Sequence, residues 1–116
     1  MSDLDSALTR LDDEHAAATA LLADLRRDFT GMVDASADSN ADDEHDPEGS
    51  TIAFERSQVT TMIDQTARRL AEIDAARARV ADGTYGRCEV CGRPIAPARL
   101  EAMPSATRCI EHASQP

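Results

Sequence analysis

Gly83-Thr84-Tyr85-Gly86-Arg87-Cys88-Glu89-Val90-Cys91-Gly92 and, further on, Cys109-Ile110-Glu111-His112 contain every cysteine of the chain. The first stretch carries a C-x2-C pair and the second a C-x2-H pair, with 17 residues between Cys91 and Cys109. A tight turn can point both side chains of such a pair to one side, so the two pairs supply four soft or borderline ligands. These are the ligands of a closed tetrahedral zinc site. We therefore predict one structural zinc ion, bound by Cys88, Cys91, Cys109 and His112, and no catalytic metal, because no coordination position is left open.

Two other uses of these cysteines fit the sequence less well. A redox dithiol at Cys88 and Cys91 would be preceded by a strand and would open a helix within a βαβ unit. Here Gly83, Gly86 and Gly92 interrupt the surroundings, and no alternating apolar strand precedes Cys88. A disulfide would leave one of the three cysteines unpaired, and no secretory signal indicates an oxidising compartment.

The composition favours long helices over a large core. Only three of the 116 residues are aromatic, and every basic residue is arginine. Residues 1–50 hold 14 acidic side chains and 3 arginines, whereas residues 51–116 hold 8 acidic side chains and 9 arginines. A net charge of −10 disfavours direct nucleic-acid binding, because phosphates would repel the chain. Without a long apolar run, we expect no membrane segment and a cytoplasmic protein.

Residues 2–33 are predicted to form a helix with an apolar seam. The seam residues follow a 4-3 spacing over four heptads: Leu4, Leu8, Leu11, His15, Ala18, Leu22, Leu25, Phe29 and Met32. His15 lies on this seam. A metal ligand or a pH switch would fit there, but a half-buried histidine that weakens the seam locally is the preferred interpretation.

The apolar pattern stops after Val33, and residues 34–47 are predicted to form an acidic loop. A second helix is predicted over residues 48–82, with Gly83 as its C-terminal cap. Its seam positions are Ile52, Arg56, Val59, Ile63, Thr66, Leu70, Ile73, Arg77 and Val80. The fold class is therefore mainly α: an antiparallel coiled-coil hairpin over residues 1–82, followed by a zinc-finger module over residues 83–116. Pairing within one chain is favoured, so we expect a monomer, although pairing between chains stays open.

The finger residues resemble the DksA/TraR zinc-finger family. The likeness rests on residues 83–95, on the run Arg99-Leu-Glu-Ala-Met-Pro104 and on Cys109-Ile-Glu-His112, and it extends back along the second helix to about residue 46. Better-known members bind RNA polymerase, and their coiled coil enters the secondary channel with acidic residues at its tip. The resemblance thus implies a non-enzymatic transcription regulator with RNA polymerase as partner and one Zn²⁺ at the four ligands named above.

The resemblance also indicates which acidic residues would act at the tip. The signature of the best-known branch is Asp-x-x-Asp-x-Ala, and the nearest string here is Asp43-Glu-His-Asp46-Pro-Glu48. Asp42, Asp43, Asp46 and Glu48 are therefore the candidate contacts to the polymerase active-site region. A solvated acidic linker is the alternative. The alarmone ppGpp is a further candidate partner, but longer family members use a helix after the finger for that contact, and these 116 residues do not include it.

Other function classes stay open beside the polymerase regulator. The hairpin could serve as an adaptor for another protein or as a self-pairing coiled coil. The finger could act as a thiol or zinc sensor, because loss of the metal would unfold it. An enzyme is disfavoured, because the sequence shows no nucleophile–base pair, phosphate-binding loop or open metal position.

Overall fold

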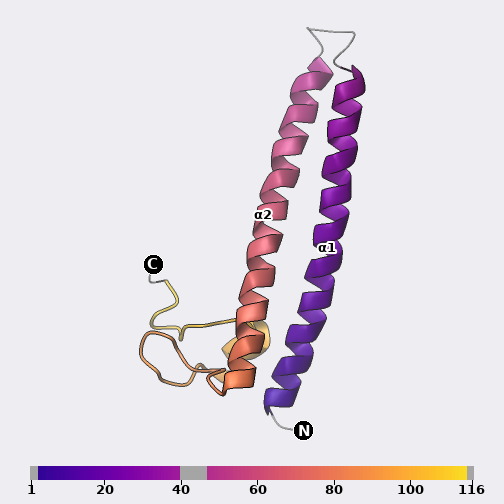
Figure 1. Cartoon of the computed structure of the whole chain (residues 1–116). Coiled ribbons are helices and arrows are strands. Elements are labelled where there is room, and N and C mark those ends of the chain that lie inside the picture. Colours follow the sequence, from indigo (N-terminus) through magenta and orange to yellow (C-terminus); the bar gives the residue numbers. More distant parts are fainter. Residues whose placement is uncertain (1–2, 40–46, 115–116) are drawn as a thin grey trace. The chain divides into compact units, whose positions relative to one another are not determined.

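The computed structural model describes the backbone of residues 3–39 and 47–114, and the side chains of residues 4–34 and 51–114. Three helices follow in order: α1 (Asp3–Ser39), α2 (Pro47–Asp82) and the short α3 (Pro97–Ala102). The two long helices run side by side in opposite directions (Figure 1), as a mainly helical hairpin requires. None of the described helices combines the length and apolar character needed to cross a bilayer.

The first helix is longer than the sequence pattern predicts. It continues to Ser39, so residues 34–39, which were assigned to the acidic loop, are helical. The prediction used the end of the apolar seam as the end of the helix. A helix can outlast its buried face, because its backbone hydrogen bonds run within the segment and need no partner element. The second helix begins at Pro47, one residue before the predicted start, and proline is favoured at this first helical position.

The chain divides into two compact units, which we call the finger unit (Met1–Ala17 with Leu70–Pro116) and the hairpin unit (Ala18–Arg69). The sequence-based division at residue 83 separated the finger from both helices. The packing instead groups the first turns of α1 and the last turns of α2 with the finger. The metal module therefore shares its packing with helical residues.

In the finger unit, α1 and α2 meet through a narrow apolar seam. Ala7, Leu11, Ile73 and Ala76 are buried, and Leu11 and Ile73 are the largest side chains that are fully enclosed. Alanine at two of these positions lets the helices approach closely. The predicted seam fails at the start of α1, where Leu4 and Leu8 are exposed and Ala7 takes the inner position.

Polar contacts flank this seam. Arg77 Nε lies 3.1 Å from a carboxylate oxygen of Asp12, and His15 Nε2 lies 3.3 Å from one of Asp74. The first pair joins an acidic residue of the first helix to an arginine of the second. Both pairs are substantially exposed, so each contributes little to stability. His15 is half-buried beside a carboxylate, which agrees with the preferred interpretation of this residue.

The hairpin unit continues the predicted seam. Ala18, Leu22 and Leu25 of α1 and Thr66 of α2 are buried. The Thr66 hydroxyl donates a 2.7 Å hydrogen bond to the Met62 carbonyl oxygen, so the buried polar group is satisfied.

The last turn of α2 ends at a left-handed glycine. Gly83 has a φ of +84°, which only glycine adopts without strain. The amides of Thr84 and Tyr85 both donate to the Arg79 carbonyl oxygen, at 3.0 and 3.2 Å. This confirms Gly83 as the C-terminal cap and turns the chain into the finger.

Candidate metal centre

The first pair of ligand residues sits on a tight turn. The Gly92 amide donates to the Cys88 carbonyl oxygen, and the Cys88 amide donates to the Arg93 carbonyl oxygen, both at 2.9 Å. Gly92 has a φ of +73°, which explains the glycine directly after the C-x2-C pair. The Val90 amide approaches Cys88 Sγ at 3.4 Å. Amides aimed at the sulfur favour the thiolate, which is the form that binds metal.

The second pair, Cys109 and His112, lies on a similar turn. We call these two turns the first and second hooks, and one backbone hydrogen bond joins them. The His112 amide donates to the Cys109 carbonyl oxygen at 3.0 Å, and the Glu89 amide donates to the Thr107 carbonyl oxygen at 2.8 Å. Arg108 Nε also donates to Glu89 Oε1 at 2.7 Å. The two hooks, far apart in sequence, are therefore joined by a backbone hydrogen bond and an ion pair in addition to their shared ligand cluster.

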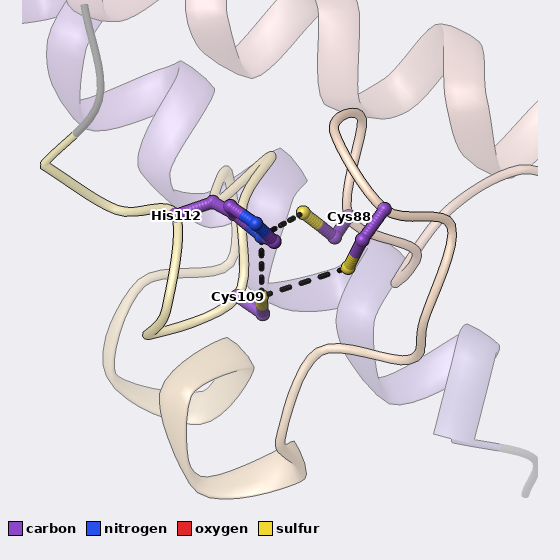
Figure 2. A group of neighbouring side chains, drawn as sticks. Cys88, Cys109 and His112 are labelled. Carbon is purple, nitrogen blue, oxygen red and sulfur yellow. Dashed lines mark hydrogen bonds between the residues drawn. The ribbon is translucent and has the colours of Figure 1, made fainter.

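The structure brings all four predicted ligand residues together. One ligand atom from each of Cys88, Cys91, Cys109 and His112 lies within 4.8 Å of the others. His112 Nδ1 is 3.2 Å from Cys109 Sγ and 3.6 Å from Cys88 Sγ, and Cys91 Sγ is 3.9 Å from Cys109 Sγ. Figure 2 shows the labelled side chains of Cys88, Cys109 and His112 converging on one point.

These distances fit a tetrahedral zinc ion. Zinc–sulfur bonds of about 2.3 Å at tetrahedral angles separate two sulfurs by about 3.8 Å, close to the Cys91–Cys109 distance. Three cysteines and one histidine form a complete structural ligand set, so the finger holds one zinc ion in a closed site. In the described part of the chain, no other group of three or more Cys, His, Asp or Glu side chains converges in this way.

The thiols also show the electrostatic character of a metal site. Burial favours the neutral thiol of Cys88, but hydrogen bonds from the backbone of Cys109, Cys91 and Val90 and from the Cys91 side chain outweigh it and lower the Cys88 pKa to about 6. For Cys91, a backbone hydrogen bond from Arg93 lowers the pKa, but burial and the neighbouring thiols of Cys88 and Cys109 raise it overall. Several thiolates gathered at one point repel one another until a cation neutralises them.

The finger is held together around the hooks by few contacts. The Tyr85 hydroxyl donates to the Pro104 carbonyl oxygen at 2.7 Å, and Arg99 Nε of α3 donates to the Arg108 carbonyl oxygen at 2.9 Å. Ile95 is buried, whereas the apolar side chain of Met103 is 50% exposed. The break in α3 after Ala102 turns Met103 outward.

The sequence pattern did not mark two residues that are buried in the loop after α3. Ser105 and Ala106 are buried beside the second hook. Small residues in a loop carry no apolar periodicity, so no pattern marked them. The tyrosine and the two arginines that fasten the loops were visible in the sequence only as isolated residues.

The candidate tip residues cannot be placed. Asp42, Asp43 and Asp46 lie outside the described residues, and Glu48 lies in the first turn of α2, where only the backbone is described. Their proposed role therefore stays a prediction.

Comparisons with known proteins agree with the site. Residues 83–111 match the family described as prokaryotic dksA/traR C4-type zinc finger. The match ends one residue before His112, which stands where a C4-type finger has its fourth cysteine. Imidazole nitrogen is an established replacement for thiolate in tetrahedral zinc sites.

Curated relatives share the same part of the chain. The RNA polymerase-binding transcription factor DksA of Caulobacter vibrioides is 50% identical over 48 residues, which are 41% of this chain and 34% of that protein. General stress protein 16O of Bacillus subtilis is 42% identical over 55 residues, 43% of this chain and 34% of that protein. The chain thus spans about a third of the length of these relatives.

A solved structure extends the likeness to both helices. Transcription factor DksA2 from Pseudomonas aeruginosa matches with a TM-score of 0.55 and 26% identity, over 93% of this chain and 81% of that chain. The long helices and the finger therefore occur together in a known fold.

Proposed function

Since residues 83–111 of this chain are a zinc finger of the DksA/TraR family, we propose that the protein is a transcription regulator that binds RNA polymerase. A protein with this partner works in the cytoplasm. It is not an enzyme: the family is one of transcription factors, and the site is built to hold a metal with four protein ligands and not to react.

One observation carries this proposal: the 50% identity to a protein titled RNA polymerase-binding transcription factor DksA. The identity is high over a short stretch. The structural likeness adds that 93% of the chain can be aligned with transcription factor DksA2. Together they support the partner class more strongly than either comparison alone.

The same likeness supports a mode of action. We propose that the α1–α2 hairpin enters the secondary channel of the polymerase and that Asp42, Asp43, Asp46 and Glu48 act near the active centre. Carboxylates suit basic channel walls or a magnesium-bearing centre. Two long paired helices provide a stiff support for such a tip. The zinc ligands Cys88, Cys91, Cys109 and His112 are assigned a structural role within this scheme.

Crosslinking tests the partner and the mode of action separately. A photoreactive amino acid at position 43 or 46 should crosslink to polymerase subunits at the secondary channel when the zinc-loaded protein is mixed with core enzyme. The same group at exposed Gln65 in α2 serves as the comparison position. Failure of core polymerase to capture the protein would refute the proposal that RNA polymerase is its partner. Capture with crosslinks only outside the channel would overturn the mode of action alone.

The acidic tip is tested by a matched pair of double variants. Asp43→Ala with Asp46→Ala should leave polymerase capture nearly intact but change transcript yield in a purified system. Asp28→Ala with Asp64→Ala removes the same charge from exposed positions in the described helices and should leave the yield unchanged. Equal transcript yields for both double variants would indicate that the tip acts only as a spacer. Running each assay with and without ppGpp shows whether the alarmone takes part.

One observation favours a second candidate, an interaction protein with a different partner or a second copy. Phe54 is 63% exposed on α2, and Met62, two turns further along, is also exposed. Sedimentation distinguishes the possibilities: a stable dimer at micromolar concentration would support self-pairing, whereas a monomer supports the hairpin within one chain.

A further inference from the structure

The hairpin unit carries a partly apolar, uncharged stripe on the exposed side of α2. Phe54 and Met62 are 63% and 45% exposed. Helical spacing places them on one face with Gln58 and Gln65, which are also exposed. Residues 57–63 include no charged side chain. The buried seam against α1 uses other positions of the helix. This stripe, from Phe54 to Gln65, therefore has no packing partner within the described part of the hairpin unit.

The surface around the stripe is shaped to accept side chains of a second helix. Two shallow depressions of about 500 and 520 Å³ share Ser57 and Thr61 in their lining. Phe54 and Met62 also line the first, and Phe29 of α1 also lines the second. Small residues between large ones give the ridges and grooves through which helices pack. Thr61 Oγ1 donates to the Ser57 carbonyl oxygen at 3.0 Å, so a partner can cover this hydroxyl without leaving its donor unpaired.

The charges at the two ends of the stripe are complementary to each other. Glu55 is exposed near its start, and Arg68 and Arg69 are exposed just beyond its end. Residues 55 and 69 are two heptads apart, so they lie along the same edge of the helix face. Phe54 and Arg68 have the same separation and lie along the opposite edge. A second α2 running in the opposite direction would therefore bring the acidic end of each stripe to the basic end of the other.

We propose that two copies of this chain associate weakly through these stripes, with their α2 helices antiparallel and Thr61 and Met62 nearest the two-fold axis. Glu55 of each copy then lies opposite Arg69 of the other copy, and the two Met62 side chains meet. Parallel helices would instead set Glu55 against Glu55 and Arg69 against Arg69, so the charges select the antiparallel arrangement. Each copy keeps its own hairpin of α1 and α2.

The other edge of the stripe contributes an apolar contact. In the same register, Phe54 of one copy lies opposite Arg68 of the other. The aliphatic stem of an arginine covers apolar surface, and its guanidinium group is attracted to an aromatic face. Every contact of such an isologous interface occurs twice, so each favourable pair counts double.

The association is weak because the paired surface is small. Four to five turns of one helix per copy cover less than a standard interface, which buries about 1,200–2,000 Å². The net charge of −10 on each chain also opposes association. We therefore expect a dissociation constant of about 0.1 mM, with monomers at micromolar concentration. The inference is independent of polymerase binding, and its test uses no polymerase.

Sedimentation equilibrium of the full-length, zinc-loaded protein tests the pairing from about 10 µM to about 1 mM. Glu55→Arg and Arg69→Glu should each weaken dimerisation at least tenfold, because two pairs of opposite charges become two pairs of like charges. Glu55→Arg adds two positive charges to the net −10 and gives −8. A general charge effect would therefore strengthen association of this variant, whereas the proposed contact weakens it.

An equimolar mixture of the two variants tests the register. In the mixed dimer, both contacts between positions 55 and 69 again join opposite charges, so the mixture should dimerise at least tenfold more tightly than either variant alone. Asp28→Arg makes the same charge change as Glu55→Arg at an exposed position of α1 and should not weaken dimerisation. Circular dichroism and zinc content check the fold of each variant.

Three results would contradict the proposal. A protein that remains monomeric up to about 1 mM does not pair in this way. A dimer that neither Glu55→Arg nor Arg69→Glu weakens uses another surface. Losses in both variants without recovery in the mixture would refute the contact between Glu55 and Arg69.

Discussion

Ile73 is the position where the narrow core of the finger unit can be tested most directly. Its side chain is 0% exposed, and it is one of only two large, fully enclosed side chains among the described residues. Ile73→Ala deletes three carbon atoms. Loss of their burial costs about 2.4 kcal/mol at about 0.8 kcal/mol per carbon, and the cavity left behind adds to this, for a total of about 3–4 kcal/mol.

Ile110 offers the same chemical change at an exposed position. Its side chain is 82% exposed in the second hook of the same unit. Ile110→Ala should therefore cost less than about 0.5 kcal/mol. Both variants and the unaltered protein would be unfolded in urea with excess zinc and followed by circular dichroism at 222 nm. The free energies of unfolding are compared at one zinc concentration, because the metal contributes to stability.

Equal losses for Ile73→Ala and Ile110→Ala would refute this reasoning. That result would mean that the helical seam contributes little to the finger unit and that metal binding alone holds it. A loss at Ile73 larger than about 5 kcal/mol would also be informative, since it would exceed what one isoleucine-to-alanine cavity normally costs.

Three further predictions follow from the finger unit. Metal analysis should find one zinc per chain, and chelation should abolish the contacts between the two hooks while much helical signal persists; a finger that keeps its fold without zinc would contradict the structural site. Tyr85 is the only tyrosine, so absorbance at 295 nm should report its ionisation with a midpoint above 10.0 in the folded protein and near 10.0 in urea. Because the folded-state pKa is the higher one, the protonated phenol stabilises the fold below pH 10.0, and this contribution disappears as the pH rises through the folded-state pKa; a native midpoint at or below 10.0 would be inconsistent with this. Gly83→Ala should cost about 1 kcal/mol through its left-handed backbone, since a Cβ there meets no other atom, and Gly31→Ala in α1 should instead be neutral or stabilising.

The metal centre could be predicted from sequence because its signal is local. Two residue pairs at fixed short spacing determine which side chains converge, whatever lies between them. Gly83, which follows α2, and Gly92, which follows the C-x2-C pair, were predictable for the same reason. Each occupies a left-handed position that an adjacent turn requires. Both helices were also predictable in type and order from their seams.

The parts that could not be predicted depend on packing between distant segments. Ala7 and not Leu8 is buried at the start of α1, because the inner position there must accommodate close approach. Apolar character alone would place Met103 in a core, but the chain leaves α3 at that residue, and Ser105 and Ala106 are buried instead. The end of α1 was misplaced because apolar periodicity reports the buried face and not the length of the helix.

The grouping of the helix ends with the finger changes how zinc should be understood. Among the described residues, the finger alone buries few side chains, and the adjoining helical turns add two large, fully enclosed ones, Leu11 and Ile73. Metal binding and the helical seam must therefore both stabilise the finger unit. Loss of zinc would then impair the proposed binding to polymerase even if no finger residue touched the polymerase. A loss of function after removal of zinc is consequently no evidence for a finger contact; only substitutions at exposed finger residues such as Val90 or Ile110, made with zinc bound, can reveal one.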